Sequence, residues 1–371
     1  MTSGLGRGTG TRFGSGWISG VLSVTFGALG YGGVLCLLFP DLLTTPEARP
    51  LYPLDLIRLL IGAFLIAGFG LGVLSTLLRR RKTLGLTGVG LAVAATLLGG
   101  PWVEISGPVT NTRSLGLDWF LLNLLVLAVL FVPLERVFPR RPEQRIFRIG
   151  WQTDLAHLAV SHLLVQVTVF LTMAPAAIAF AWAARPWLRA WVTSQPIVVQ
   201  AVEALIVADL AQYWAHRAFH QVPALWRFHQ VHHSCVVLDW LAGSRLHLVD
   251  IVVTRGLSFV PLYVLGFAPA AVYAYLVFVS FHAVFIHANV RFRLRALDWL
   301  FVTPRYHHWH HAAHAEAVDR NFAVHLPLID RLFGTAYLPG DRWPDVYGIA
   351  GNPIPEGYLA QLAYPFARVR A

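Results

Sequence analysis

Histidines are the residues of this chain whose type and spacing could do chemistry. Of its 16 histidines, 14 fall between His216 and His325. Residues three or four apart share one face of a helix, so clustered histidines would aim several imidazoles at one point. Neutral imidazole binds Zn, Cu, Fe and Ni, and many imidazoles held close together cannot all stay cationic. The spacing therefore predicts metal ligands, in the clusters His216-x3-His220, His229-x2-His232-His233 and His307-x2-His310-His311, with single histidines at 247, 282 and 287 between the second and third clusters.

Some of the histidines are better explained without metal. An isolated histidine in a membrane protein is usually hydrogen-bonded in the interior or placed at the interface. We interpret His157, His162, His314 and His325 in that way. His308 belongs to the third cluster, but the repeated H-x2-H-H pattern does not need it. Three clusters with matching offsets are a much stronger signal than any one pair.

An acidic residue precedes the first cluster on the same helical stripe. Asp209, Tyr213, His216 and His220 are separated by four, three and four residues. A carboxylate within a membrane helix is costly and is usually functional. We expect Asp209 to accept the spare N–H of a metal-bound imidazole, which fixes the tautomer of that ring. The alternative is an ion pair with Arg217 or Arg245.

Composition indicates which elements position these residues. Hydrophobic residues make up 56% of the 371-residue chain and charged residues 13%, against about 25% charged in soluble domains. Runs of roughly 20 apolar residues are long enough to span a membrane. Six spanning helices are predicted before the first cluster, at Trp17–Pro40, Leu59–Leu78, Thr83–Val103, Trp119–Leu134, Leu158–Ala184 and Pro196–Ala215.

The basic residues orient these helices. The formal charge is +10, but the arginines lie in loops between apolar runs, which favours contact with anionic lipid over nucleic acid. With the N-terminus inside, the inner loops carry eleven Arg and Lys residues and the outer loops carry five. The sixth helix then delivers His216 to the cytoplasmic face. The two cysteines, Cys36 and Cys235, indicate neither a disulfide framework nor a thiolate zinc site.

A further apolar stretch, Gly256–Ile286, is broken at Gly266–Pro269. Its first leg, from Gly256 to Leu265, has ten residues, too few to span, so we expect a re-entrant or interfacial helical hairpin. The predicted fold is an all-α, polytopic membrane helical bundle with a histidine-rich helical metal domain at its cytoplasmic face. The predicted segments are N-terminal helices (1–134), helices leading into the core (135–203), the catalytic domain (204–338) and an irregular tail (339–371).

The histidine series resembles the fatty acid hydroxylase and sterol desaturase superfamily, from about Glu135 to Leu338. The motifs that carry the resemblance are DLAQYWAHRAFH from Asp209, FHQVHHS from Phe228, His287-Ala-Asn289, TPRYHHWHH from Thr303, DRNF from Asp319 and DRLFGT from Asp330. The first 134 residues lie outside it.

This resemblance implies a non-haem di-iron centre that uses O2 to hydroxylate or desaturate a lipid. It implies iron ligands at His216, His220, His229, His232, His233, His287, His307, His310 and His311, with His282 as an additional ligand. Tyr213, His247, Asn321 and Asp209 become candidates for supporting the ligands, and no catalytic residue is expected outside the metal site. The lipid comes from the bilayer, and electrons come from a separate cytochrome b5-like or ferredoxin-like protein, because the chain has no flavin or haem motif.

Two other functions compete with lipid oxidation. A zinc-dependent membrane hydrolase would need an open metal position and a base, usually glutamate, yet no glutamate lies between His216 and His311. A metal transporter would carry its histidines within spanning helices. A carboxylate-bridged iron bundle is also disfavoured, because Asp239, Asp250 and Asp298 are the only acids in that block.

Overall fold

The computed structural model describes residues 14–45, 49, 53–105, 114–292 and 296–367. Among these residues the regular secondary structure is helical, with two isolated β-bridges, Pro139 with Val290 and Ala312 with Tyr347. The chain divides into two compact units, Met1–Leu124 and Leu125–Ala371. The prediction of an all-α membrane protein is therefore confirmed. Within the described residues, seven helices are long and apolar enough to cross a membrane: Trp17–Leu38, Leu54–Leu78, Thr83–Trp102, Leu117–Val137, Ile197–Gln221, Leu248–Leu265 and Pro269–His287.

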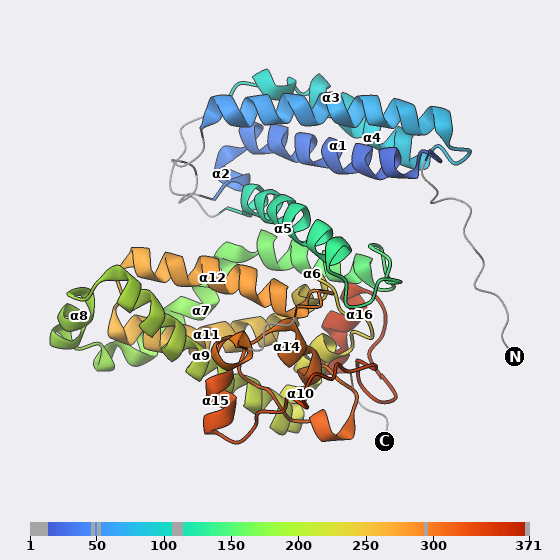
Figure 1. Cartoon of the computed structure of the whole chain (residues 1–371). Helices are drawn as coiled ribbons and strands as arrows, with labels where there is room; N and C mark the ends of the chain where they lie inside the picture. Colours follow the sequence, from blue (N-terminus) through green and yellow to red (C-terminus); the bar gives the residue numbers. More distant parts are fainter. Residues whose placement is uncertain (1–13, 46–48, 50–52, 106–113, 293–295, 368–371) are drawn as a thin grey trace, which may run out of the picture. The chain divides into compact units, whose positions relative to one another are not determined.

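The first unit is built on three helices that lie side by side in Figure 1: α1 (Trp17–Leu38), α3 (Leu54–Leu78) and α4 (Thr83–Leu97). Small residues let their backbones approach closely, as is usual for membrane helices. A Cβ atom on Gly88 would lie 1.8 Å from Ser23 Oγ, and that hydroxyl donates to Gly68 O at 2.6 Å. The short α2 (Pro40–Leu43) and the start of α5 (Leu117–Val137) complete this unit.

The second unit carries the remaining helices. They are α6 (Trp151–Leu163), α7 (Val165–Phe180), α8 (Pro186–Thr193), α9 (Ile197–Gln221), α10 (Pro223–His233), α11 (Leu248–Leu265), α12 (Pro269–His287), α13 (Leu297–Leu300), α14 (Pro304–His310), α15 (Pro327–Leu332) and α16 (Tyr358–Ala363). The long helix α9 packs against α11, α12 and α10, and α7 packs against α11.

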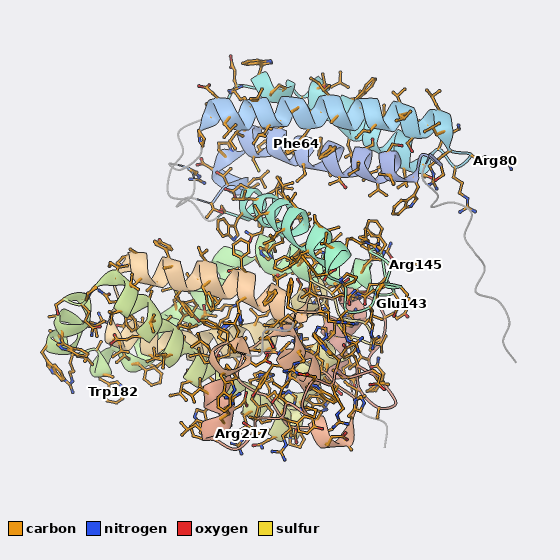
Figure 2. The ribbon with its side chains drawn as sticks, viewed as in Figure 1. Phe64, Arg80, Glu143, Arg145, Trp182 and Arg217 are labelled. Atoms are coloured by element: carbon orange, nitrogen blue, oxygen red, sulfur yellow. The ribbon has the colours of Figure 1, made fainter. Side chains whose placement is uncertain are left out.

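The long helices run between two ends of this unit. At one end, Gln200 near the start of α9 accepts a hydrogen bond from Ala268 N in the α11–α12 turn at 2.9 Å, and Arg189 of α8 donates to Tyr263 O. Figure 1 shows α8 at this end, and Figure 2 shows Trp182 there, with Glu143 and Arg145 at the opposite end. The C-terminal ends of α9 and α12 and the N-terminal end of α11 meet away from α8. All the long helices therefore connect the same two ends.

Three predicted elements differ from the structure. The expected ten-residue first leg of the hairpin is wrong, because α11 begins at Leu248 and has 18 residues. The N–H of Val249 donates to the His247 side chain and caps this helix, so the helix starts well before its apolar run. The expected span Leu158–Ala184 is two helices, α6 and α7, which meet at Leu164. The tail also contains α16, although it was expected to be irregular.

Candidate metal centre

Four helices deliver the clustered histidines to one place. His216 and His220 lie on the last turns of α9, and His229, His232 and His233 end α10. His287 is the last residue of α12. His307 and His310 lie on the seven-residue α14, which His311 caps. Each helix ends or turns at the same region, so spacing of three and four residues brings the rings onto a common face.

Five of these residues form what we call the first histidine group: His216, His220, His229, His233 and His310. One nitrogen from each lies within 4.8 Å of the others. The Nε2 atoms of His216 and His229 are 3.0 Å apart. The Nε2 atoms of the other three rings are buried and have no hydrogen-bond partner among the described residues. Buried polar atoms are normally satisfied, so these converging lone pairs fit a metal ion.

The other four residues form the second histidine group: His232, His287, His307 and His311. Their Nε2 atoms also converge, with His287 Nε2 3.3 Å from His232 and 2.9 Å from His307. His311 Nε2 lies 3.1 Å from His307 Nε2. The two groups adjoin, because the His233 ring centroid is 4.6 Å from that of His310 and 4.5 Å from that of His311. Such an arrangement suits two metal ions side by side.

The rings are kept neutral by their surroundings. Burial lowers the pKa of the histidines outside the spanning helices well below the ordinary value, and neighbouring imidazoles lower each pKa further. This holds for His229, His232, His233, His307, His310 and His311. A neutral ring keeps a lone pair for metal. The nine imidazoles are therefore a donor set suited to transition-metal ions rather than to Mg²⁺ or Ca²⁺.

Hydrogen bonds donated by the outward Nδ1–H groups orient most of the rings. In the first group, His229 Nδ1 lies 2.6 Å from Asp250 Oδ2. The Nδ1 atoms of His216 and His310 face the carbonyl oxygens of Phe322 at 2.7 Å and Arg320 at 2.8 Å. In the second group, the corresponding carbonyls are Arg245 O for His232, at 3.1 Å, and Ala283 O for His287, at 2.7 Å. Such contacts fix the tautomer that leaves Nε2 free for metal.

His282 does not join either group. Its Nδ1 atom lies 2.9 Å from Nδ1 of His325, and its Nε2 has no partner among the described residues. His282 precedes His287 by five residues, which is about 140° around a helix at 3.6 residues per turn. The two rings of α12 therefore face different directions, and the expectation of a shared site is corrected.

Asp209 also has partners other than those expected. Its carboxylate accepts the backbone N–H groups of Val324, His325 and Leu326 at 3.2, 3.2 and 2.7 Å. Among the described residues, neither an imidazole nor an arginine forms a hydrogen bond or an ion pair with this carboxylate. Asp209 is fully buried, so these N–H groups compensate its burial. It holds the segment that follows Phe322, whose carbonyl orients His216.

The other supporting candidates stabilise neighbouring segments rather than rings. The Tyr213 hydroxyl lies 3.0 Å from Thr335 Oγ1. His247 caps α11, and its Nε2 lies 3.0 Å from Leu362 O near the C-terminus. The Asn321 amide donates to Tyr306 O and Tyr337 O at 3.0 and 2.8 Å. Asn321 has φ 60°, a left-handed conformation that asparagine tolerates better than most residues.

Sequence reasoning did not assign a role to Asp250, which takes the contact expected of Asp209. The available signal was a lone acidic residue in an apolar helix, the same signal that singled out Asp209. Spacing along one helix could not find it, because Asp250 lies on α11 and its partner His229 on α10. His308, set aside in the sequence, bonds to the Tyr347 hydroxyl at 2.8 Å and lies in neither group.

Comparison with known proteins agrees with this geometry. The fatty acid hydroxylase family pattern matches residues 201–335, which contain all nine clustered histidines. The ornithine lipid hydroxylase OlsE of Rhizobium tropici is 33% identical over 263 residues, covering 67% of this chain and 76% of that protein. The human alkylglycerol monooxygenase is 32% identical over 152 residues, and the match covers 41% of this chain but 33% of that protein.

A fungal relative, the fatty acid hydroxylase vlmA of a Lecanicillium species, is 29% identical over 165 residues, covering 40% of this chain and 42% of that protein. No solved structure gives a significant match. The family pattern and the paired histidine groups fall on the same part of the sequence, and the similarity to a lipid hydroxylase extends over two thirds of the chain. The chain therefore belongs to the fatty acid hydroxylase family and is a membrane lipid hydroxylase, an oxidoreductase.

Proposed function

We propose that the protein hydroxylates a polar membrane lipid with O2, using one iron ion in each histidine group. The observation that carries this proposal is the convergence of nine imidazoles in two adjoining groups. The ligands would be the five histidines of the first group and the four of the second. Iron held there would supply O2 activation and hydrogen removal from a C–H bond. His282 is not included, because it faces His325.

The protein's own residues would keep this centre dry and in one geometry. The first group is buried except for His220, which is half-buried, and the second group is wholly buried. Asp250 and the carbonyls of Phe322, Arg320, Arg245 and Ala283 would hold the rings that ligate. A zinc hydrolase would need a carboxylate base beside the metal. In the described part of the chain, neither group includes a carboxylate, which favours oxidation over hydrolysis.

The lipid class is inferred from the relatives. OlsE is named for ornithine lipid, and its match covers most of its length. We propose a substrate of that kind, a membrane lipid with a charged headgroup, which reaches the site laterally from the bilayer. Each cycle would convert one C–H bond and O2 to an alcohol and water, and would consume two electrons and two protons.

The electrons would come from a separate ferredoxin-like or cytochrome b5-like protein.

We further propose that the histidine groups face the cytoplasm. With α6 and α7 together taken as the fifth crossing, eleven basic residues lie in the inner loops and five in the outer loops. This count supports the orientation, since cytoplasmic loops carry an excess of Arg and Lys. Reporters fused after Leu338 and in the 79–82 loop should both be cytoplasmic, and a reporter in the 104–118 loop should be external. An external C-terminal reporter would overturn the orientation.

The function is tested with the full-length protein in membranes. Supplied with reductant, a donor protein and lipid, it should consume O2 and add one oxygen atom to the lipid, as seen by mass spectrometry. Purified anaerobically, it should hold about two iron ions per chain, and chelation should abolish the reaction. Release of a hydrolysed lipid without O2 consumption, restored by zinc, would contradict the proposal.

A further inference from the structure

A polar cavity lies where α5 leaves the predicted membrane region, and Asn289, two residues after His287, is part of its lining. Its volume is about 120 Å³, large enough for one phosphate or carboxylate group but not for a whole lipid. Its walls include Arg136, Arg141, Arg145, Glu135, Trp240 and Asn289. With three arginines and one glutamate, the formal charge of this lining is +2. This charge favours an anionic occupant.

Backbone contacts fix the cavity to the catalytic core. The N–H of Arg141 donates to Asn289 Oδ1 at 2.9 Å, and Asn289 Nδ2 donates to Arg141 O at 3.1 Å. Asn289 lies two residues after His287 of the second histidine group. A group bound in the cavity would therefore contact a segment that lies two residues from a candidate metal ligand.

The charged residues of the lining differ in how far they are already engaged. Glu135 Oε1 accepts the N–H groups of Trp240 and Asn289 at 2.7 and 2.8 Å. Arg141 lies 4.7 Å from the centroid of the Tyr347 ring and donates to Asp345 O. Arg136 and Arg145 are exposed, and their side chains make no hydrogen bond or ion pair with a described residue. These two guanidinium groups are therefore available to a ligand.

We infer that this cavity binds the anionic headgroup of a membrane lipid, through Arg136 and Arg145. Guanidinium groups match phosphate and carboxylate geometry with paired hydrogen bonds. The position at the end of a spanning helix places the cavity at headgroup depth. Trp240 and the prolines of the lining would contact the apolar part next to the headgroup. The link to turnover rests on the proposed lipid hydroxylation, but binding itself does not.

The test measures lipid retention, which does not depend on turnover. Iron-loaded, full-length protein is purified in detergent, mixed with phosphatidylglycerol or phosphatidylcholine, and examined by native mass spectrometry. The variant R136Q/R145Q should retain phosphatidylglycerol roughly 25-fold more weakly, since each surface cation near an anionic lipid contributes about fivefold. Retention of phosphatidylcholine should not change. The control is R80Q, which removes another exposed juxtamembrane arginine, one that lies in the first unit (Figure 2).

Several results would decide the inference. An equal loss of lipid in R80Q would show that retention comes from general attraction between basic loops and lipid. This result would overturn the proposal of a specific site. Binding of inorganic phosphate without retention of the lipid would overturn the lipid as occupant. Unchanged lipid retention with weaker binding of an acidic electron-transfer protein would instead assign the arginines to donor docking.

If the lipid is the substrate, R136Q/R145Q should raise KM and leave kcat unchanged. A retention loss in a protein with no hydroxylase activity would separate this site from the proposed function.

Discussion

The two histidine groups share helices α10 and α14 but are supported differently. In the first group, His229 is oriented by the Asp250 carboxylate at 2.6 Å, and His220 Nδ1 lies 3.4 Å from the exposed Asp319. Four of its five rings have a partner at Nδ1. In the second group, only backbone carbonyls orient rings. The Nδ1 atoms of His307 and His311 have no partner among the described residues.

The segment that orients the first group is itself held by carboxylates. Asp330 accepts the N–H groups of Phe322 and Ala323 at 2.8 and 2.9 Å, and Asp209 accepts the next three. Phe322 then presents its carbonyl to His216. A ring fixed on both sides loses less freedom when it binds metal, and a carboxylate raises its basicity. We therefore expect the first group to hold its metal more tightly than the second.

The largest effect is expected from removing one ligand of each group. His310→Ala should remove the metal of the first group, and His232→Ala should remove that of the second. Both should abolish turnover, because the proposed reaction needs both ions. Metal analysis should give about one iron ion per chain in each variant, with membrane insertion unchanged. His314→Gln, in neither group, is the control. Full activity in either alanine variant would refute the site assignment.

Stepwise chelation of the wild-type protein tests the comparison directly. A weak chelator should take the first iron ion from the second group, so His232→Ala should lose its remaining iron more slowly than His310→Ala. Equal rates for the two variants would show that orientation by Asp250 and Phe322 does not affect metal retention.

Asp250→Asn should have the next largest effect. Asparagine keeps the shape of aspartate but accepts the His229 Nδ1–H less strongly. Loss of such a contact typically costs about 10–100-fold in metal affinity or activity. Asp319→Asn is the matched control, because Asp319 is exposed and lies farther from its ring; it should change little. Activity per bound iron and iron affinity are both measured. Normal values for Asp250→Asn would contradict the expectation that the Asp250 contact makes the first group bind metal more tightly.

Most of the candidate metal centre could be predicted from the sequence, because short-range spacing determines it. His216 and His220 share one turn of α9, and the H-x2-H-H repeats end two short helices. The arrangement of nine of the ten proposed ligands in two groups was not visible in the sequence. His229 and His233 join His310, whereas His232 joins His311, and this division depends on how α10 and α14 face each other.

The errors have the same origin. His282 was included on a spacing of five residues, which does not keep two rings on one helix face. Asp209 and His220 do lie on one helical stripe, but the Asp209 carboxylate accepts backbone N–H groups of Val324–Leu326 instead of an imidazole N–H. The start of α11 was missed because His247 and Asp250 are polar, and their partners lie outside the helix. Long-range partners, rather than local pattern, decide all three cases.

A smaller effect is expected for Asp209→Asn, which separates support of the fold from support of a ring. The carboxylate accepts three backbone N–H groups, and asparagine offers one acceptor oxygen to them. Hydrogen bonds to charged groups contribute about 1.5–3 kcal/mol, so thermal stability and protein abundance should fall. Turnover per bound iron should stay close to normal. A fall in turnover per iron of tenfold or more would show that the variant disturbs His216 through Phe322.

The smallest effect concerns pH, where the two groups should behave alike. An ordinary histidine has a pKa near 6.5, so protons would displace metal from exposed imidazoles as the pH falls through that value. Burial and neighbouring imidazoles lower the pKa of His310 in the first group and of His232 and His311 in the second. Lower pKa values mean that these rings stay neutral at about pH 6, so protons compete poorly with metal. Iron per chain, measured after equilibration between about pH 8 and pH 6, should therefore be constant in both ligand variants and in the wild type. Loss of iron centred near pH 6.5 from His310→Ala alone would show that the second group is open to water, and would locate the asymmetry in burial rather than in the orientation of the rings.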